Sequence, residues 1–336
     1  MKEIEKIIKD KTIIRLDNDV VSELFSAYCE FGAISKTAEI LAALPEKTRE
    51  PIIHTLGSHV TKEKPVFVYS LLKSSGISED KATEAAAVVD LLWCLSLMYD
   101  DMFDQDLKRS GLPSSWVKFG SDETYKSAYA GLEVVKKMSE IYFGPESPSQ
   151  IDKYIGQGLT SLKVHKNLKT DVSTSILLDN YRQRALFHTA LPFVLVDTKY
   201  NNDNPAFLGI ENVNLAGQIL NDLKDISPKY IWLREGFSDI RSGIMSVPIA
   251  ILLEKLSNSD KTKMLEMFGG GQLSNIQRST ILEMFIQSGT LVDAIRLTRN
   301  IYNNSLLQFR SVLKTEFYKY IEMWIGYKLQ QLDDLI

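Results

Sequence analysis

Apolar residues recur every three or four positions along most of the chain, which is the spacing of helices that each bury one face. The clearest helical stretches in the first third of the chain are residues 19–30, 37–44, 47–56, 64–73 and 78–106. The alternation typical of strands is scarce. Later breaks are rich in glycine, proline and asparagine, and lie at residues 111–113, 144–148, 201–205, 257–259 and 269–271. The pattern predicts an all-α fold of about ten or more helices, many of them long.

The composition supports this prediction, because 336 residues contain only 18 glycines and 10 prolines. An apolar fraction of 44% and a charged fraction of 24% are typical of a globular chain. The 39 basic and 43 acidic residues give a net charge of −4, and no basic cluster stands out. This balance argues against nucleic acid as the main partner.

Two cysteines, Cys29 and Cys94, are too few for a disulfide framework and indicate a reducing compartment. The first ten residues are charged and have no apolar core, so we expect no signal peptide. The most apolar stretch, residues 85–99, is interrupted by Asp90 and is shorter than the roughly 20 residues that cross a bilayer. We therefore expect a cytoplasmic protein without a membrane span.

Three carboxylates end the longest predicted helix. Asp100 and Asp104 lie one turn apart on the same face, and Asp101 lies about 100° round the helix. Carboxylates that converge in this way repel one another unless a cation neutralises them, and oxygen ligands of this kind suit Mg²⁺. The alternative interpretation is a solvated acidic helix end.

A second cluster repeats the spacing: Asn221, Asp222 and Asp225 follow an apolar helical stretch at residues 213–220. Two acidic clusters on facing helices would hold several Mg²⁺ ions and a diphosphate, and the metals would act as Lewis acids on the leaving diphosphate. The pair of clusters favours this interpretation over two unrelated acidic helix ends.

With these motifs the chain resembles the trans-isoprenyl diphosphate synthase (polyprenyl synthetase) family, which is itself similar to class I terpene synthases. The resemblance covers about residues 48–330. It rests on five segments in order, namely Asp90 to Asp104, Lys108 to Pro113, Tyr181 with His188 and Thr189, Gln218 to Asp225, and Ser238 to Pro248. It implies an all-α isoprenoid synthase-type bundle around a central cavity in residues 48–336, after an N-terminal helical extension at residues 1–47. It also implies a homodimer and about three Mg²⁺ ions.

The resemblance assigns a role to each matching residue. The catalytic carboxylates are Asp100, Asp101, Asp104, Asp222 and Asp225, and Asn221 joins them as a metal ligand. The diphosphate-binding residues are Arg109, His188, Thr189, Gln218 and Arg234. The cavity residues are Trp93, Leu95, Ser96 and Tyr99. Asn221 replaces a family aspartate and His188 a family lysine.

The isopentenyl diphosphate side departs from the family. Its Gly-Lys-x-x-Arg-Pro reads Val-Thr-Lys-Glu-Lys-Pro at residues 60–65, a histidine is replaced by Trp93, and the second arginine of a pair by Ser110. A diphosphate needs several cationic donors to be held against water, so we expect this site to be degraded. Lys62 and Lys64 could still serve if the alignment slips by one or two residues. Trp93 is either a core aromatic or a cavity wall that stabilises a carbocation.

These residues predict an enzyme that ionises an allylic prenyl diphosphate, followed by terpene synthase-like cyclisation or elimination. The alternative is a prenyltransferase that condenses the cation with isopentenyl diphosphate or another acceptor. A non-catalytic regulatory subunit is the third hypothesis, against which the retained carboxylates count. Ser96 leaves room one turn from Asp100, and Trp93 lies roughly 10 Å from it along the helix, which favours a chain of 15 or 20 carbons.

Overall fold

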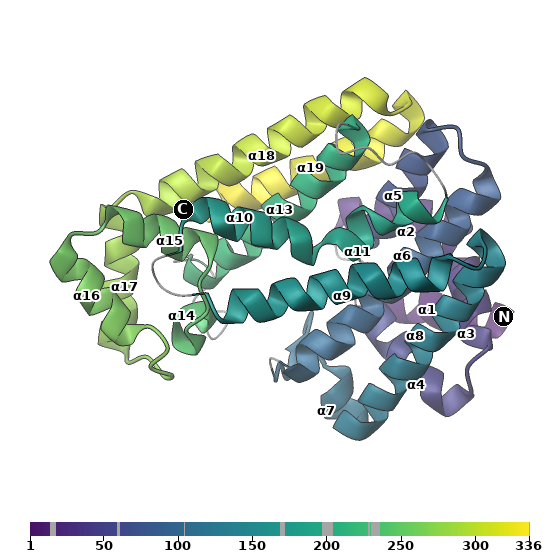
Figure 1. The fold of residues 1–336 in the computed structure, drawn as a ribbon, viewed down its shortest axis with the longest axis horizontal. Helices are drawn as coiled ribbons and strands as arrows, with labels where there is room; N and C mark the ends of the chain where they lie inside the picture. The colour runs from purple at the N-terminus through teal and green to yellow at the C-terminus, as the bar shows by residue number, and fades with distance from the viewer. Residues whose placement is uncertain are drawn as a thin grey trace. The chain divides into compact units, whose positions relative to one another are not determined.

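The computed structural model describes residues 1–13, 18–58, 61–103, 105–168, 172–196, 204–227, 229 and 236–335. Over these residues it contains nineteen α-helices and one pair of two-residue strands (Figure 1), which confirms the all-α prediction. Contacts between residues divide the chain into two units. The first comprises Met1–Tyr154, Ala190–Asn202 and Val312–Trp324, and the second Ile155–Thr189, Asp203–Ser311 and Ile325–Ile336.

The first unit is built around one apolar helix. Its elements are α1 (Lys2–Ile13), α2 (Asp19–Glu30), α3 (Ala33–Ala42), α4 (Glu46–Ser58), α5 (Glu63–Ser74), α6 (Glu79–Phe103), β1 (Lys108–Arg109), β2 (Leu112–Pro113), α7 (Ser115–Phe119), α8 (Ser121–Phe143) and α12 (Leu191–Leu195). Helices α3, α4, α5 and α8 pack on α6. An 18-residue window of α6 has a mean hydropathy of 1.4, enough to cross a membrane by composition, but 83% of it is buried here. A helix that is apolar all round and buried in this way is a core helix.

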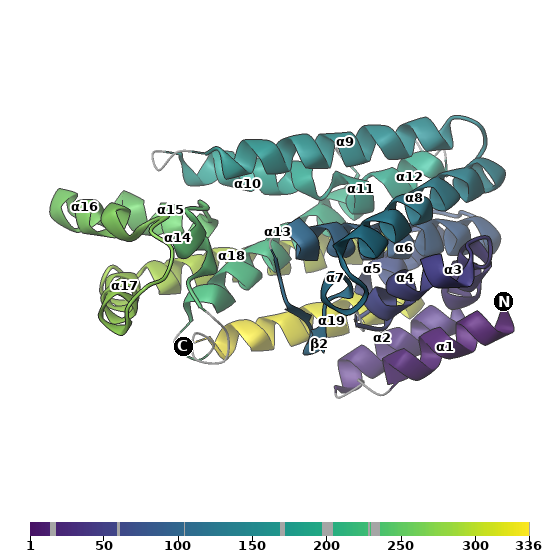
Figure 2. The same cartoon turned by 90° about the horizontal axis from the view of Figure 1, so that it is seen from below.

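The N-terminal helices belong to this packing. Figure 2 shows α1 along α3 and α4, and α2 packs on α3 and α5. Helix α2 has the predicted bounds, whereas α6 ends three residues before the predicted 106. The boundary at residue 47 rests on the resemblance, so the division into an extension and a catalytic domain stays a prediction.

A tight hairpin follows α6. Strand β1 pairs antiparallel with β2, and the two residues between them, Ser110 and Gly111, have φ values of +48° and +82°. Positive φ at both central positions is the geometry of the two-residue turn that matches strand twist. The hairpin sets Arg109 beside the end of α6.

The second unit is assembled on α13 (Pro205–Ile226). Its other elements are α10 (Thr174–Arg184), α11 (Leu186–Thr189), α14 (Ser238–Ser242), α15 (Val247–Lys255), α16 (Asn258–Met267), α17 (Asn275–Gln287) and α18 (Thr290–Val312), while α9 (Ser147–Lys166) and α19 (Thr315–Asp333) belong partly to each unit. Asn204 caps α13 by accepting a hydrogen bond from the Ala206 amide, and Pro205 occupies its first turn. Helices α10, α11, α14 and α15 pack on α13, and Asp222 is among its buried residues.

Candidate active site

The first carboxylate cluster lies at the carboxyl end of α6. Asp100 is half exposed and Asp101 is buried. The helix dipole disfavours negative charge at this end, so the cluster needs a cation. Arg109 supplies one: its Nε donates to Oδ1 of Asp101 at 2.8 Å, its Nη2 donates to the same oxygen, and Nη2 lies 3.5 Å from Asp100 Oδ2. The predicted ligand Asp104 lies outside the described residues.

The second cluster lies on α13, where Asp222 is 6% exposed. The Tyr181 hydroxyl donates to Asp222 Oδ2 at 2.7 Å, and Gln218 Nε2 donates to Oδ1 at 3.1 Å. Burial raises the pKa of Asp222 to about 6, although these two hydrogen bonds and the charge of Arg184 oppose the shift. Asn221 is exposed to solvent.

Asp225 lies one turn further along α13 and binds the start of α14. It accepts hydrogen bonds from the Ser238 hydroxyl at 3.0 Å and from the Asp239 amide at 3.3 Å. This places the Asp239 carboxyl close to Asp225 and Asp222, and burial followed by the charges of these two residues raises its pKa well above its ordinary value. Sequence reasoning missed Asp239, although it lies in the family-like segment at residues 238–248.

These carboxyls suit a divalent cation. Burial also raises the pKa of Asp225, so burial disfavours the charged form of all three carboxyls in this region. Among the described residues, however, no three His, Cys, Asp or Glu side chains are grouped closely enough to hold an ion by themselves. Mg²⁺ commonly completes its shell with water and substrate phosphates, so this donor set fits Mg²⁺ bound together with a diphosphate.

The predicted diphosphate ligands of the second unit have partners within it. His188 is buried and its Nε2 donates to Asn214 Oδ1 on α13 at 2.8 Å. Thr189 is also buried and donates to the Ala185 carbonyl at 3.0 Å. Gln218 is bonded to Asp222, as described above, and Arg234 lies outside the described residues. Their roles toward diphosphate stay predictions.

The four predicted cavity residues divide between two faces of α6. Trp93 and Ser96 lie on the same face of α6 as Asp100, because the three residues are three and four positions apart. The Ser96 hydroxyl donates to the Trp93 carbonyl at 2.7 Å. Leu95 and Tyr99 are turned toward α8: Leu95 packs against Gly131, and the Tyr99 ring lies 5.9 Å from that of Tyr125. The face with Trp93 and Ser96 is therefore the better candidate for a chain-length determinant.

Lys62, a candidate for binding isopentenyl diphosphate, is fully buried at a backbone φ of +45°. Its Nζ lies 3.1 Å from both oxygens of Asp90, and the Tyr28 hydroxyl donates to Asp90 Oδ2 at 2.8 Å. Lys64 lies over Trp93, with Nζ 4.0 Å from the ring centroid. Both lysines thus have partners in the protein.

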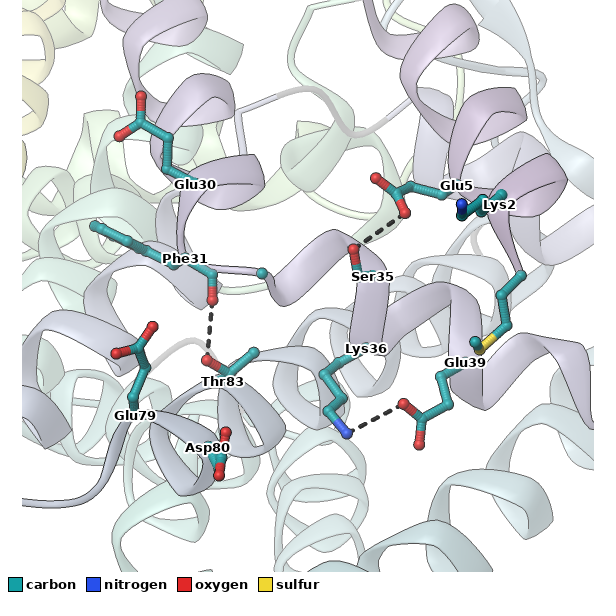
Figure 3. A pocket seen from close by; sticks show the side chains of 12 residues that line it. Lys2, Glu5, Glu30, Phe31, Ser35, Lys36, Glu39, Glu79, Asp80 and Thr83 are labelled. Carbon is teal, nitrogen blue, oxygen red and sulfur yellow. Dashed lines mark hydrogen bonds and ion pairs between the residues drawn. The ribbon is translucent and has the colours of Figure 1, made fainter.

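A hollow of about 420 Å³ lies elsewhere in the first unit, between α1, α2, α3 and the start of α6 (Figure 3). Its lining includes five carboxylates, Glu5, Glu30, Glu39, Glu79 and Asp80. They would repel a diphosphate. Asp100 lies seventeen positions after the lining residue Thr83 on α6, about 25 Å along the helix. The hollow is therefore separate from the first carboxylate cluster.

Comparisons with known proteins agree with the motifs. The sequence model of the family described as Polyprenyl synthetase matches residues 45–284. Geranylgeranyl pyrophosphate synthase A of Phomopsis amygdali is 25% identical over 240 residues, which are 68% of this chain and span only 62% of that relative. Geranylgeranyl diphosphate synthase of Sulfolobus acidocaldarius is 24% identical over 281 residues, 77% of this chain and 83% of that protein.

Solved structures share the fold. The geranylgeranyl pyrophosphate synthetase of Pyrococcus horikoshii superposes with a TM-score of 0.75 at 17% identity, covering 93% of this chain and 98% of that one. A decaprenyl diphosphate synthase of Rhodobacter capsulatus superposes with a TM-score of 0.76 at 13% identity, covering 93% of this chain and 99% of that one. A geranylgeranyl pyrophosphate synthase of Corynebacterium glutamicum, complexed with isoprenyl diphosphate and magnesium, gives 0.62 at 14% identity, covering 98% and 99%. The predicted isoprenoid synthase-type fold is confirmed.

Proposed function

Because the chain belongs to the polyprenyl synthetase family, we propose that it is a prenyltransferase that ionises an allylic prenyl diphosphate and condenses the cation with isopentenyl diphosphate. The names of its relatives, geranylgeranyl diphosphate synthases, support this choice of acceptor. The observation that carries the proposal is the cluster of carboxyls of Asp222, Asp225 and Asp239 at the junction of α13 and α14, which Asp225 holds together through its bonds to Ser238 and Asp239; burial raises the pKa of each.

Mg²⁺ would be held by the two carboxylate clusters, which contain Asp100, Asp101, Asp104, Asn221, Asp222 and Asp225. We propose about three ions, as the resemblance implies. When bound, Mg²⁺ supplies Lewis-acid stabilisation of the diphosphate as the C–O bond breaks and the electron pair leaves with the oxygen. Arg109 holds the Asp101 carboxylate in place through an ion pair and hydrogen bonds, and its guanidinium is a second source of positive charge for the leaving group.

A second candidate function is a terpene synthase-like reaction, in which the cation cyclises or loses a proton without a diphosphate acceptor. The contacts of the two acceptor-side lysines favour it. Lys62 is neutralised by Asp90, and Lys64 lies over Trp93, so neither is presented as an open cationic site. Because Lys64 already lies over one face of the half-buried Trp93 ring, a carbocation would be stabilised by the opposite face.

Product analysis distinguishes the two. The purified protein with Mg²⁺ is given geranyl, farnesyl or geranylgeranyl diphosphate, each with and without isopentenyl diphosphate, and diphosphates and hydrocarbons are quantified separately. A prenyltransferase yields longer diphosphates only when isopentenyl diphosphate is present. Hydrocarbons or alcohols formed equally without it would favour the terpene synthase-like reaction, and no turnover of any substrate would favour the regulatory subunit.

A restoration experiment tests the acceptor site directly. The quadruple variant Thr61→Lys, Lys64→Arg, Trp93→His and Ser110→Arg rebuilds the family pattern. If the acceptor site is degraded, the variant gains elongation that the parent lacks. Strong elongation by the parent would show instead that this unusual site still binds isopentenyl diphosphate.

We also propose that the enzyme is a homodimer and acts in the cytoplasm. The first point is tested by light scattering at micromolar concentration. A monomeric mass with full activity would contradict it.

A further inference from the structure

The hydroxyl of Tyr181 reaches the carboxylate of a proposed metal ligand from a different helix. Tyr181 lies near the end of α10 and is 4% exposed, and Asp222 lies on α13 and is 6% exposed. The hydroxyl donates to Asp222 Oδ2 at 2.7 Å. A buried bond of this kind to a carboxylate is strong and directional, so it fixes where the remaining lone pairs of the carboxylate point.

Both oxygens of Asp222 are held. Gln218, one turn earlier on α13, donates to Oδ1 at 3.1 Å, while Tyr181 holds Oδ2. With both oxygens bonded, the carboxylate has little freedom to rotate about its last torsion. Each oxygen keeps a lone pair for another ligand, since a carboxylate offers about four acceptor positions.

The Tyr181 ring is itself held in position. His165 of α9 lies with its ring centroid 5.5 Å from that of Tyr181, and the Arg184 guanidinium lies 5.6 Å from the Tyr181 centroid. Both contacts come from the second unit, as do Tyr181 and Asp222. The hydroxyl is therefore presented to Asp222 by a packed, rigid surround.

We propose that Tyr181 is a positioning residue for Mg²⁺: its hydroxyl orients the Asp222 carboxylate for metal binding from outside the coordination shell. This inference rests on the proposed function, in which Asp222 is a metal ligand. Residues that orient a ligand in this way typically change metal affinity by about 10- to 100-fold. A bond that only joined α10 to α13 would change stability and leave metal affinity unaltered.

The experiment is a Mg²⁺ titration in the presence of excess inorganic diphosphate. Binding is measured by the rise in melting temperature and, separately, by isothermal titration calorimetry. Tyr181→Phe should weaken Mg²⁺ binding by about 10- to 100-fold. The matched control is Tyr142→Phe, which also removes a buried hydroxyl bonded to a carboxylate, that of Glu39 at 2.9 Å in the first unit. The control should bind Mg²⁺ like the wild type. In turnover assays, Tyr181→Phe should need more Mg²⁺ yet approach the wild-type kcat at saturation.

The outcomes separate this inference from the proposed function. Wild-type protein that binds no Mg²⁺ with diphosphate overturns both. Wild-type binding with an unchanged Tyr181→Phe variant overturns the positioning role alone. In an Asp222→Ala background, Tyr181→Phe should cause no further loss, and an additional loss would contradict action through Asp222. If Tyr181→Phe does not fold, the half-buried Gln218→Leu tests the same carboxylate, and unchanged affinity there overturns the inference.

Discussion

Replacing Lys62 by methionine tests whether this lysine holds the fold or a substrate. Its ammonium is the only donor to Oδ1 of Asp90 among the described residues, at 3.1 Å, and shares Oδ2 with the Tyr28 hydroxyl. Methionine keeps most of the aliphatic stem and removes the charge. The substitution therefore leaves the Asp90 carboxyl buried without its cationic partner, and its Oδ1 loses its described donor.

The expected cost follows from the burial of both partners, each 0% exposed. Breaking a buried ion pair by removing one partner costs about 3–5 kcal/mol. For a unit of this size class, 1 kcal/mol corresponds to roughly 2–4 °C in Tm, so Lys62→Met should lower Tm by roughly 6–20 °C. Adding Asp90→Asn should recover much of the loss, because the isolated charge is then gone.

The change in Tm is measured by thermal unfolding, with circular dichroism as the signal. Lys64→Met is the matched control: the same substitution two residues away, at a half-exposed site, removes a cation–π contact worth about 0.5–1 kcal/mol and no fully buried ion pair. Its Tm should fall by a few degrees at most. A Lys62→Met variant that melts like the wild type but loses affinity for isopentenyl diphosphate would refute the structural role, and Lys62 would be a substrate ligand.

Three further predictions concern the site. The raised pKa of Asp222 means that the metal-free fold favours its protonated form. Stability should therefore fall as pH rises from about 4 through about 6, and Asp222→Asn should reduce this dependence in denaturant titrations at each pH. Asn221→Asp should keep kcat within a few-fold in a diphosphate-release assay, since either side chain offers an oxygen to Mg²⁺; complete loss would show a specific need for the amide. Ser96→Phe should shift substrate preference toward geranyl diphosphate in competition assays, because its face leads to Asp100; unchanged preference would place the prenyl chain elsewhere.

Local patterns were enough to predict the fold class. Helix α2 has the predicted bounds because a capping asparagine, Asn18, precedes an amphipathic stretch. The long apolar run predicted α6, since apolar residues all round a helix require burial. The spacing of Asp222 and Asp225 placed them on one helix end, where the structure has them.

Contacts between residues distant in sequence were not predictable. Asp90 pairs with Lys62 across 28 residues and with Tyr28 across 62. The local spacing of apolar and polar residues does not indicate either partner. The Asp239 carboxyl lies near the second cluster because Asp225 accepts a hydrogen bond from the Asp239 amide at the start of α14, a contact between two helices that spacing along the chain does not predict. The buried bond of His188 to Asn214 likewise depends on packing between α11 and α13.

The central claim is that both carboxylate clusters serve Mg²⁺-dependent ionisation of an allylic diphosphate. The most direct measurement is release of inorganic diphosphate from farnesyl and geranylgeranyl diphosphate, with isopentenyl diphosphate present, by the wild type and by Asp100→Ala and Asp222→Ala. Asp122→Ala, an exposed carboxylate on α8, is the control. We predict that diphosphate release requires Mg²⁺, falls by about 100-fold or more in both cluster variants, and is unchanged in the Asp122→Ala control. Release that persists in either cluster variant, or without Mg²⁺, would contradict the claim.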